Sequence, residues 1–419
     1  MSIIRQGFES ADLDVPVVLP TLNLDFANSQ SLDKRITFSR GSIGTFVNKN
    51  GLIETASANQ PRFDFDPISG ECRGLLIEES RTNLITSSNN FGGGDTNLGV
   101  TASATTSPDG TTNASKLFEK TTNNYRIFNG AFTTIAGTAC CGSVFVKAGE
   151  NATMYIKVVQ SGGAVTNEFA FNMNTGAYAS ASGLIRGAIY YGNGWWRVYS
   201  VITPTVTSCT LQIFIRDDTS GSLTYQGDGS SGYYVYGMQA EQGAFPTSYI
   251  PTTASTVTRS ADNASMAGTN FSSWYNQTES TIFCKFNAYN NIGAGQKIII
   301  DIRGSAALGL NLVQLQLNYI SATSQHIYHN LYQNGVNFAD YFALLYTTGP
   351  TKNIMRYKDL DTFVASKDGN IRSNTSRNKT IPLTKNMDSL TFGTFNGAIS
   401  KFAYYPKALN DAEIQYLTQ

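Results

Sequence analysis

The sequence predicts an all-β protein of two tandem antiparallel β-sandwiches of the jelly-roll kind, preceded by an extended N-terminal region of short strands. Charged residues make up only 14% of the 419-residue chain, and 38 glycines are available for turns. Apolar runs of strand length, many alternating with period two, are separated by polar turns along most of the chain. A helix pattern occurs only near the C-terminal end, so sheets must supply nearly all of the core.

The turn signals divide the chain into four segments. Residues 1–21 form an irregular arm, in which Pro16 and Pro20 prevent a helix. Residues 22–91 hold short apolar segments and a hairpin-turn signal at 48–51. Three consecutive glycines then open the next segment.

The two long segments are the predicted sandwiches. Residues 92–256 form the first one and end in a proline-punctuated linker, and residues 257–419 form the second, with a hairpin turn at Lys367-Asp368-Gly369-Asn370. The second segment ends in a helix that Asn410 caps, with Glu413 three residues on, as in a capping box.

The charge balance of the chain argues against nucleic acid as a partner. Lys plus Arg and Asp plus Glu are each 30, so the net charge is zero, and no basic stripe suggests nucleic acid. The basic patch at 372–379 is diluted by Ser and Asn and indicates a solvated loop. The first residues lack a signal-peptide pattern, and no window approaches the roughly 18 apolar residues of a membrane span. We therefore expect folding in the cytoplasm and no membrane insertion.

The five cysteines are odd in number and include no Cys-x-x-Cys pair. Cys140 and Cys141 are adjacent on a predicted strand and must face opposite sides of the sheet. We expect buried or free thiols in a reducing compartment.

Catalytic residues are not predicted. Glu78 and Glu79 are neighbours on a strand, so their carboxyl groups face opposite ways and cannot flank one glycosidic bond. We expect them to pair with Arg62 or Arg81 instead. His326 and His329 are three residues apart and likewise divide between the faces of a strand. The sequence thus predicts a protein that is not an enzyme.

Two kinds of binding site stay open. Asp64, Asp66 and Glu71 offer oxygen ligands around a glycine turn, so a structural calcium ion is conceivable, although ordinary turns explain them as well. No other cofactor is expected. Aromatic residues make up 12% of the chain and can stack on sugar rings, but the same rings can fill a core. The candidate carbohydrate-binding residues are Trp195, Tyr233, Trp274 and Tyr275.

Several motifs, in order, resemble tailed-phage virion proteins. Five motifs within residues 22–91 resemble a segment that precedes a carbohydrate-binding-module-like sandwich in such proteins. They are LDF at 24–26, RITFSRGS at 35–42, GLI at 51–53, NQPRFD at 59–64 and GLLIEESRTNL at 74–84. GNGWWRV at 192–198 and MQAEQGAFPTSYIPT at 238–252 resemble the strand entry and the exit of that module. NGAISKFAYYPKALNDAEI at 396–414 is similar to the close of a concanavalin-like or laminin-G-like sandwich.

This resemblance implies a protein displayed on the surface of a virion after synthesis in the host cytoplasm. The expected function is that of a fibre or tail adhesin, which docks to other virion proteins through residues 22–91 and presents its sandwiches to host surface polysaccharide. The alternative is a purely structural head or tail decoration protein without a ligand, and a glycan depolymerase ranks last. We expect a homo-oligomer, with a trimer favoured, because sandwich edges need covering.

Overall fold

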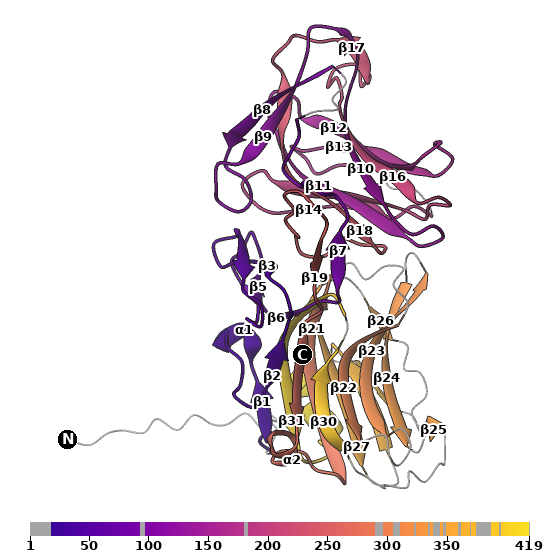
Figure 1. The fold of residues 1–419 in the computed structure, drawn as a ribbon. Coiled ribbons are helices and arrows are strands. Elements are labelled where there is room, and N and C mark those ends of the chain that lie inside the picture. Colours follow the sequence, from indigo (N-terminus) through magenta and orange to yellow (C-terminus); the bar gives the residue numbers. More distant parts are fainter. Residues whose placement is uncertain are drawn as a thin grey trace, which may run out of the picture.

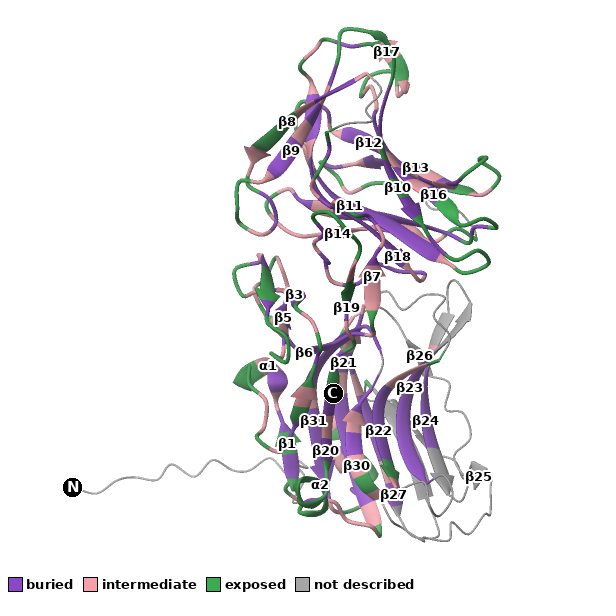
Figure 2. Ribbon diagram, in the orientation of Figure 1, coloured by how far each residue is buried: buried purple, intermediate pink, exposed green. Residues whose placement is uncertain are grey.

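The computed structural model describes residues 18–92, 97–179, 183–289, 296–304, 311–321, 324–333, 336–337, 344–346, 349–358, 362–368, 370–373, 387–393 and 395–418. Most of residues 1–21, and residues 374–379 of the basic patch, lie outside these ranges. The described chain is overwhelmingly β and forms two bodies stacked end to end (Figure 1), each with its own buried core (Figure 2). No helix in the described ranges is long and apolar enough to cross a membrane.

The upper body in Figure 1 is a β-sandwich within residues 84–256, which we call the insert sandwich. Its two antiparallel sheets are named after one strand each. The β12 sheet has the order β13 (Thr166–Asn172), β12 (Thr153–Gln160), β16 (Ser208–Ile215), β10 (Asn123–Thr133) and β17 (Thr224–Gln226). The β11 sheet has the order β14 (Arg186–Tyr190), β15 (Trp196–Ile202), β11 (Cys140–Ala148), β18 (Gly232–Gln242), β9 (Ala114–Glu119) and β8 (Leu98–Thr105).

Period-two alternation puts the core of the insert sandwich between these sheets. In β12, Met154, Ile156 and Val158 are fully buried, whereas Tyr155 and Lys157 face outward and are half-buried. The β11 sheet differs, because most of β11 is buried on both faces. Cys140 packs in the core between the sheets and Cys141 in a separate cluster on the other face, as predicted.

The lower body, the base sandwich, uses residues 18–83 and 257–418. The β21 sheet has the order β29 (Asn370–Ser373), β28 (Thr362–Lys367), β27 (Thr351–Lys358), β21 (Glu279–Ala288), β31 (Gly397–Tyr405), β6 (Cys72–Ile77) and β5 (Phe63–Phe65), and β1 (Leu22–Leu24) also pairs with β31. The β22 sheet has the order β2 (Thr37–Ser39), β20 (Asn263–Ala267), β30 (Met387–Phe392), β22 (Gln296–Gly304), β23 (Leu312–Ser321), β24 (Ser324–Gln333) and β25 (Val336–Asn337), and β26 (Leu344–Tyr346) pairs with β24.

The all-β class and both sandwiches are confirmed, but their serial arrangement is wrong. Residues 22–83 are not a separate region before the sandwiches, because β1, β2, β5 and β6 are strands of the base sandwich. Short strands cannot bury a face alone, so β1, β2 and β6 pair with strands that lie hundreds of residues later in the chain, and β5 adds to β6. The base sandwich therefore encloses the insert sandwich in sequence.

The chain crosses between the bodies twice, and the two crossings are paired. β7 (Arg81–Asn83) leads into the insert sandwich and β19 (Val257–Arg259) leads out, and they form an antiparallel two-stranded sheet. The hairpin of β3 (Gly44–Val47) and β4 (Ile53–Ala56) confirms the turn predicted at 48–51. Ile53 of this hairpin packs with Phe145 of β11, so the hairpin touches the insert sandwich.

The described helices are short: α1 (Phe26–Ser29), α2 (Thr269–Ser272) and α3 (Asp411–Thr418). The predicted capping box of α3 is confirmed. The Asn410 side chain accepts a hydrogen bond from the Glu413 N–H, and the Glu413 carboxylate accepts one from the Asn410 N–H. Ile414 is fully buried against Phe283 and Tyr405. The hairpin predicted at 367–370 is also present, with Lys367 opposite Asn370.

Candidate functional site

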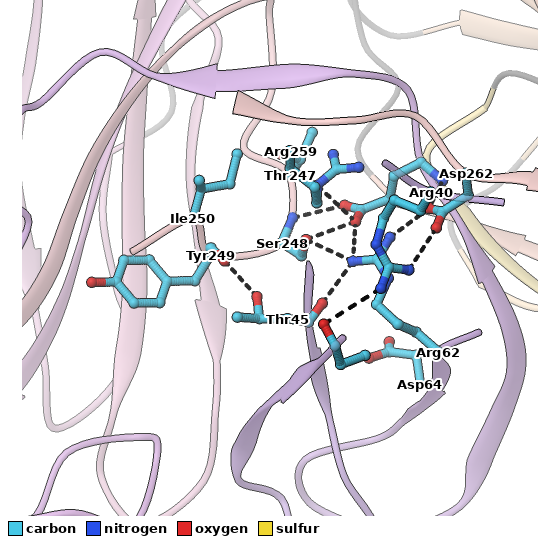
Figure 3. A network of polar contacts seen from close by, with 12 residues as sticks. Arg40, Thr45, Arg62, Asp64, Thr247, Ser248, Tyr249, Ile250, Arg259 and Asp262 are labelled. Carbon is cyan, nitrogen blue, oxygen red and sulfur yellow. Dashed lines mark hydrogen bonds and ion pairs between the residues drawn. The ribbon is translucent and has the colours of Figure 1, made fainter. Parts of the chain in front are cut away.

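The resemblance motifs meet at the junction of the two sandwiches, where a buried network of charges lies (Figure 3). Arg62 of the NQPRFD motif contacts two carboxylates, Glu78 at 2.7 Å and Asp262 at 2.5 Å. Asp262 also pairs with Arg40 at 3.0 Å. All four side chains have at most 1% of their surface exposed, so the charges are compensated inside the protein rather than by water.

Glu78 is the centre of this network. Burial alone would raise the pKa of its carboxyl group, but the charges of Arg259 and Arg62 and two hydrogen bonds from Ser248 outweigh burial and lower the pKa to about 2. Glu78 is therefore a permanent carboxylate at neutral pH. The neighbouring Glu79 faces away and contacts Arg81 and Lys297. The expected pairings of both glutamates with Arg62 and Arg81 are confirmed.

Two of the three calcium candidates, Asp64 and Asp66, already have protein partners. Asp64 is buried and accepts hydrogen bonds from the Val47 N–H at 2.9 Å and the Tyr289 hydroxyl at 2.8 Å. Asp66 accepts the N–H groups of Ile68 and Ser69 in a turn and pairs with Arg73 at 2.7 Å.

Glu71, the third calcium candidate, makes no ion pair within the described ranges and is exposed. Within those ranges no three His, Cys, Asp or Glu side chains are grouped to hold a metal ion.

Three of the four predicted sugar-binding rings are core residues, which corrects that prediction. Trp195, Tyr233 and Trp274 are at most 3% exposed. Trp195 lies under the junction, where it packs with Phe145 and donates a hydrogen bond to the Thr106 carbonyl at 3.1 Å. Ile53 of the β3–β4 hairpin and Tyr249 of the exit segment pack in the same cluster, so the Trp195 ring is covered by segments distant in the chain.

Tyr233 and the two rings of the base sandwich are held in place. Tyr233 fills the insert core and donates to the Phe214 carbonyl at 3.1 Å. Trp274 and Tyr275 pack around Phe271, and Tyr275 is hydrogen-bonded to Tyr357. Tyr275 is half-buried, and burial raises the pKa of its hydroxyl well above the ordinary value. None of the four presents an open face to a polysaccharide.

A different set of rings is accessible, on the outer face of the β12 sheet. A groove of about 530 Å³ lies across β10, β12, β13 and β16 and is bounded by the segment before β17. The lining residues are Tyr125, Ile127, Tyr155, Lys157, Glu168, Phe214, Leu223 and Thr224. Each strand contributes its outward-facing positions, because the alternate positions are in the core.

The groove combines apolar rings with polar groups held in place. The Tyr155 and Phe214 rings meet edge to face with centroids 5.8 Å apart, and Tyr125 is 45% exposed. Lys157 and Glu168 form an ion pair at 2.9 Å beside these rings. Burial and the nearby Glu168 raise the pKa of Tyr155, so its hydroxyl stays protonated. Next to the groove, Gln212 donates to Asn129 at 2.9 Å.

Sequence reasoning missed this groove although its signal was present. The run Met154 to Val158 alternates apolar and polar or aromatic residues, which predicts that Tyr155 and Lys157 share a face. The pattern does not say which strands lie beside it, so it could not bring Glu168 and Phe214 to the same face.

Comparison with known proteins adds little to this description. No protein-family model matches the chain, and no curated protein matches its sequence. Among solved structures, the CBM40 of the Ruminococcus gnavus IT-sialidase is 13% identical, with 36% of this chain and 88% of that module covered and a TM-score of 0.29. The receptor binding domain of a botulinum neurotoxin C/D mosaic serotype is 11% identical, with 37% and 39% covered and a TM-score of 0.27.

A third similar structure, Trypanosoma rangeli sialidase, is 9% identical, with 73% of this chain and 61% of that chain covered and a TM-score of 0.26. At these identities and TM-scores we transfer neither an activity nor a ligand. The assignment of two nested β-sandwiches depends on the sheet topology of the chain itself. The chain is thus an all-β protein with an open, ring-lined sheet face.

Proposed function

We propose that this chain is a non-enzymatic adhesin that binds glycans in the groove on the β12 sheet. The observation that carries the proposal is the groove itself, an open sheet face where Tyr125, Tyr155 and Phe214 lie beside an ion pair without net charge. Aromatic rings offer an apolar surface to the C–H face of a pyranose, while Lys157 and Glu168 offer a donor and an acceptor to its hydroxyl groups. A groove open along the sheet suits an extended chain of sugars.

The motifs that resemble tailed-phage proteins support a virion as the place of action, with host surface polysaccharide as the ligand. Residues 22–83 serve the base sandwich, so docking to other virion proteins falls to their outer surface and to the N-terminal arm. Leu19, Ile43 and Ile68 are large apolar residues in this part of the chain that are 48–81% exposed and so available for contact. A homotrimer is the oligomer that we propose.

A glycan array with the full chain tests the proposal. We expect binding to at least one bacterial surface polysaccharide, and Tyr155→Ala should weaken it about tenfold or more, since one well-packed ring carries roughly 1–3 kcal/mol. Tyr416→Ala is the matched control, because Tyr416 is 46% exposed on α3 of the base sandwich and far from the groove in sequence and fold. Its affinity should equal that of the unchanged protein.

A folded protein that binds no glycan would refute the adhesin and leave the decoration protein as the better explanation. In that case the groove would be covered by another virion protein, which imaging of intact particles would reveal. Polysaccharide cleavage by the purified chain would instead support the depolymerase and contradict both binding proposals.

A further inference from the structure

A second cavity lies at the junction of the two sandwiches, away from the groove. Its volume is about 280 Å³. The insert sandwich contributes Ile189, Tyr191 and Arg197 to its wall, and the base sandwich contributes Asp64, Asn287 and Tyr289. At one edge Gly192 approaches Pro67 so closely that a Cβ atom would lie 3.1 Å from the Pro67 carbonyl oxygen. The walls of this cavity therefore come from both bodies.

The aromatic walls are held in fixed positions. The Tyr289 hydroxyl donates to Asp64 at 2.8 Å, and the Arg73 guanidinium lies over the Tyr289 ring at 5.3 Å. Tyr191 meets Phe145 edge to face with centroids 4.9 Å apart. Rings positioned in advance bind a flat apolar surface without the entropy cost of ordering them.

The charged groups of the wall already have partners. Arg197 donates to the Thr247 carbonyl and to the Ser143 hydroxyl and lies 3.9 Å from Glu241. Asp64 accepts two hydrogen bonds and lies 3.8 Å from Arg73. An ionic ligand would therefore find no unbalanced charge to pair with. Carboxylate oxygens, tyrosine hydroxyls and the Asn287 amide still offer lone pairs and N–H groups to neutral hydroxyl groups.

The volume limits the size of the ligand. The cavity volume is about 280 Å³. This is below the range of most drug-sized sites and suits one six-membered ring with its substituents. Cavities at the interface between two domains are common places for such ligands.

We infer that this junction cavity binds a single neutral sugar ring, at a site separate from the groove. The site goes beyond the proposed adhesion function and does not depend on it. A ligand held by Tyr191 of one sandwich and Tyr289 of the other stabilises their contact, because it binds only when both walls are in place.

Thermal unfolding and calorimetric titration of the full chain test this inference. The probes are D-glucose, D-galactose and N-acetyl-D-glucosamine, with D-glucuronate and D-glucosamine as charged counterparts. We expect at least one neutral probe to raise Tm in a concentration-dependent way, and both charged probes to bind about tenfold or more weakly.

Two substitutions test the cavity directly: one fills it, and the other removes a polar group from its wall. Ile189→Trp adds volume from the insert side and should abolish the Tm shift, while Ile185→Trp is the matched control on the same edge of the β11 sheet but outside the cavity. Asn287→Ala removes an amide from the wall without filling the cavity and should weaken binding about tenfold. It serves as the second variant in case Ile189→Trp fails to fold.

The groove variant Tyr155→Ala separates the two sites, because it should leave the Tm shift by the monosaccharide unchanged. The inference would be overturned by loss of the shift in Tyr155→Ala, by a shift that persists in Ile189→Trp, or by an undiminished shift in Asn287→Ala. The lack of any shift with all three neutral probes would overturn it as well. None of these results depends on whether the chain binds a polysaccharide on an array.

Discussion

The carboxylate of Glu78 accepts two hydrogen bonds from Ser248, one from its backbone N–H and one from its hydroxyl group, both at 2.7 Å. The two residues are 170 positions apart, because Glu78 directly follows β6 of the base sandwich and Ser248 lies in the exit segment of the insert. Arg62 and Arg259 neutralise the same carboxylate from the base sandwich. The motifs at 59–64, 74–84 and 238–252 thus build one structural unit, a junction that orients the insert on the base.

Replacing the central carboxylate should destabilise this junction. In Glu78→Gln, Arg62 and Arg259 keep their charges but lose their shared partner inside the protein. We expect the free energy of unfolding to fall by about 3–5 kcal/mol. Urea unfolding measures the change, and Glu54→Gln is the control because Glu54 is exposed. Equal unfolding midpoints for the two variants would contradict the role of the network.

The same carboxylate predicts a loss of stability in acid. The pKa of Glu78 is about 2 in the folded chain against an ordinary value of 4.5, so the unfolded chain binds a proton first as the pH falls. The stabilisation by Glu78 is complete above about pH 4.5 and is lost progressively toward pH 2, and it corresponds to about 3 kcal/mol. Between about pH 6 and pH 3, the unchanged protein should lose more stability than Glu78→Gln. If the free energy of unfolding fell equally with pH in both proteins, the prediction would be wrong.

Gly74 should not tolerate a side chain. Its φ is +110°, and a Cβ atom would lie 2.0 Å from the Ile399 carbonyl oxygen of β31. Gly74→Ala should therefore cost about 3 kcal/mol or more, since β6 would have to move away from its neighbour. Gly92→Ala is the control, because among the described residues its Cβ atom would meet only the Asn90 side chain, at 3.6 Å, and it should stay within about 0.5 kcal/mol. Similar thermal stability of both variants would show that the strands have room to separate.

The capping box should stabilise α3 locally. Asn410→Ala removes the acceptor of the Glu413 N–H and should cost about 1 kcal/mol. Hydrogen exchange in residues 411–418 should become faster in this variant, while Gln415→Ala, an exposed change in the same helix, should leave it unchanged or slower. Faster exchange in both variants would mean that the cap is not what holds the helix.

Much of the local structure could be predicted from the sequence. The turn at 48–51, the hairpin at 367–370 and the capping box at Asn410 all occur where their residues predict them. Each depends on contacts within a few positions, so the responsible side chains are adjacent in the sequence. The opposite orientations of Glu78 and Glu79 follow in the same way from the geometry of a strand.

Less of the candidate site could be predicted from the sequence. Trp195 and Trp274 are aromatic residues in polar surroundings in the sequence, yet both are buried, because segments distant in the chain cover them. Tyr155 and Phe214 are 59 positions apart and meet only because β12 and β16 pair. A pattern of period two identifies which residues share a face, but not whether water, a ligand or another sheet lies against it.

The sequence by itself determined the all-β class, the positions of many strands and turns and the capped final helix, because these depend on local alternation and backbone preferences. Only the tertiary structure decided that the base sandwich encloses the insert, that Glu78 contacts Ser248, and which rings remain open. Those outcomes depend on strand pairing and charge burial between distant segments. The stabilising free energy of these contacts is gained only once the whole chain has folded.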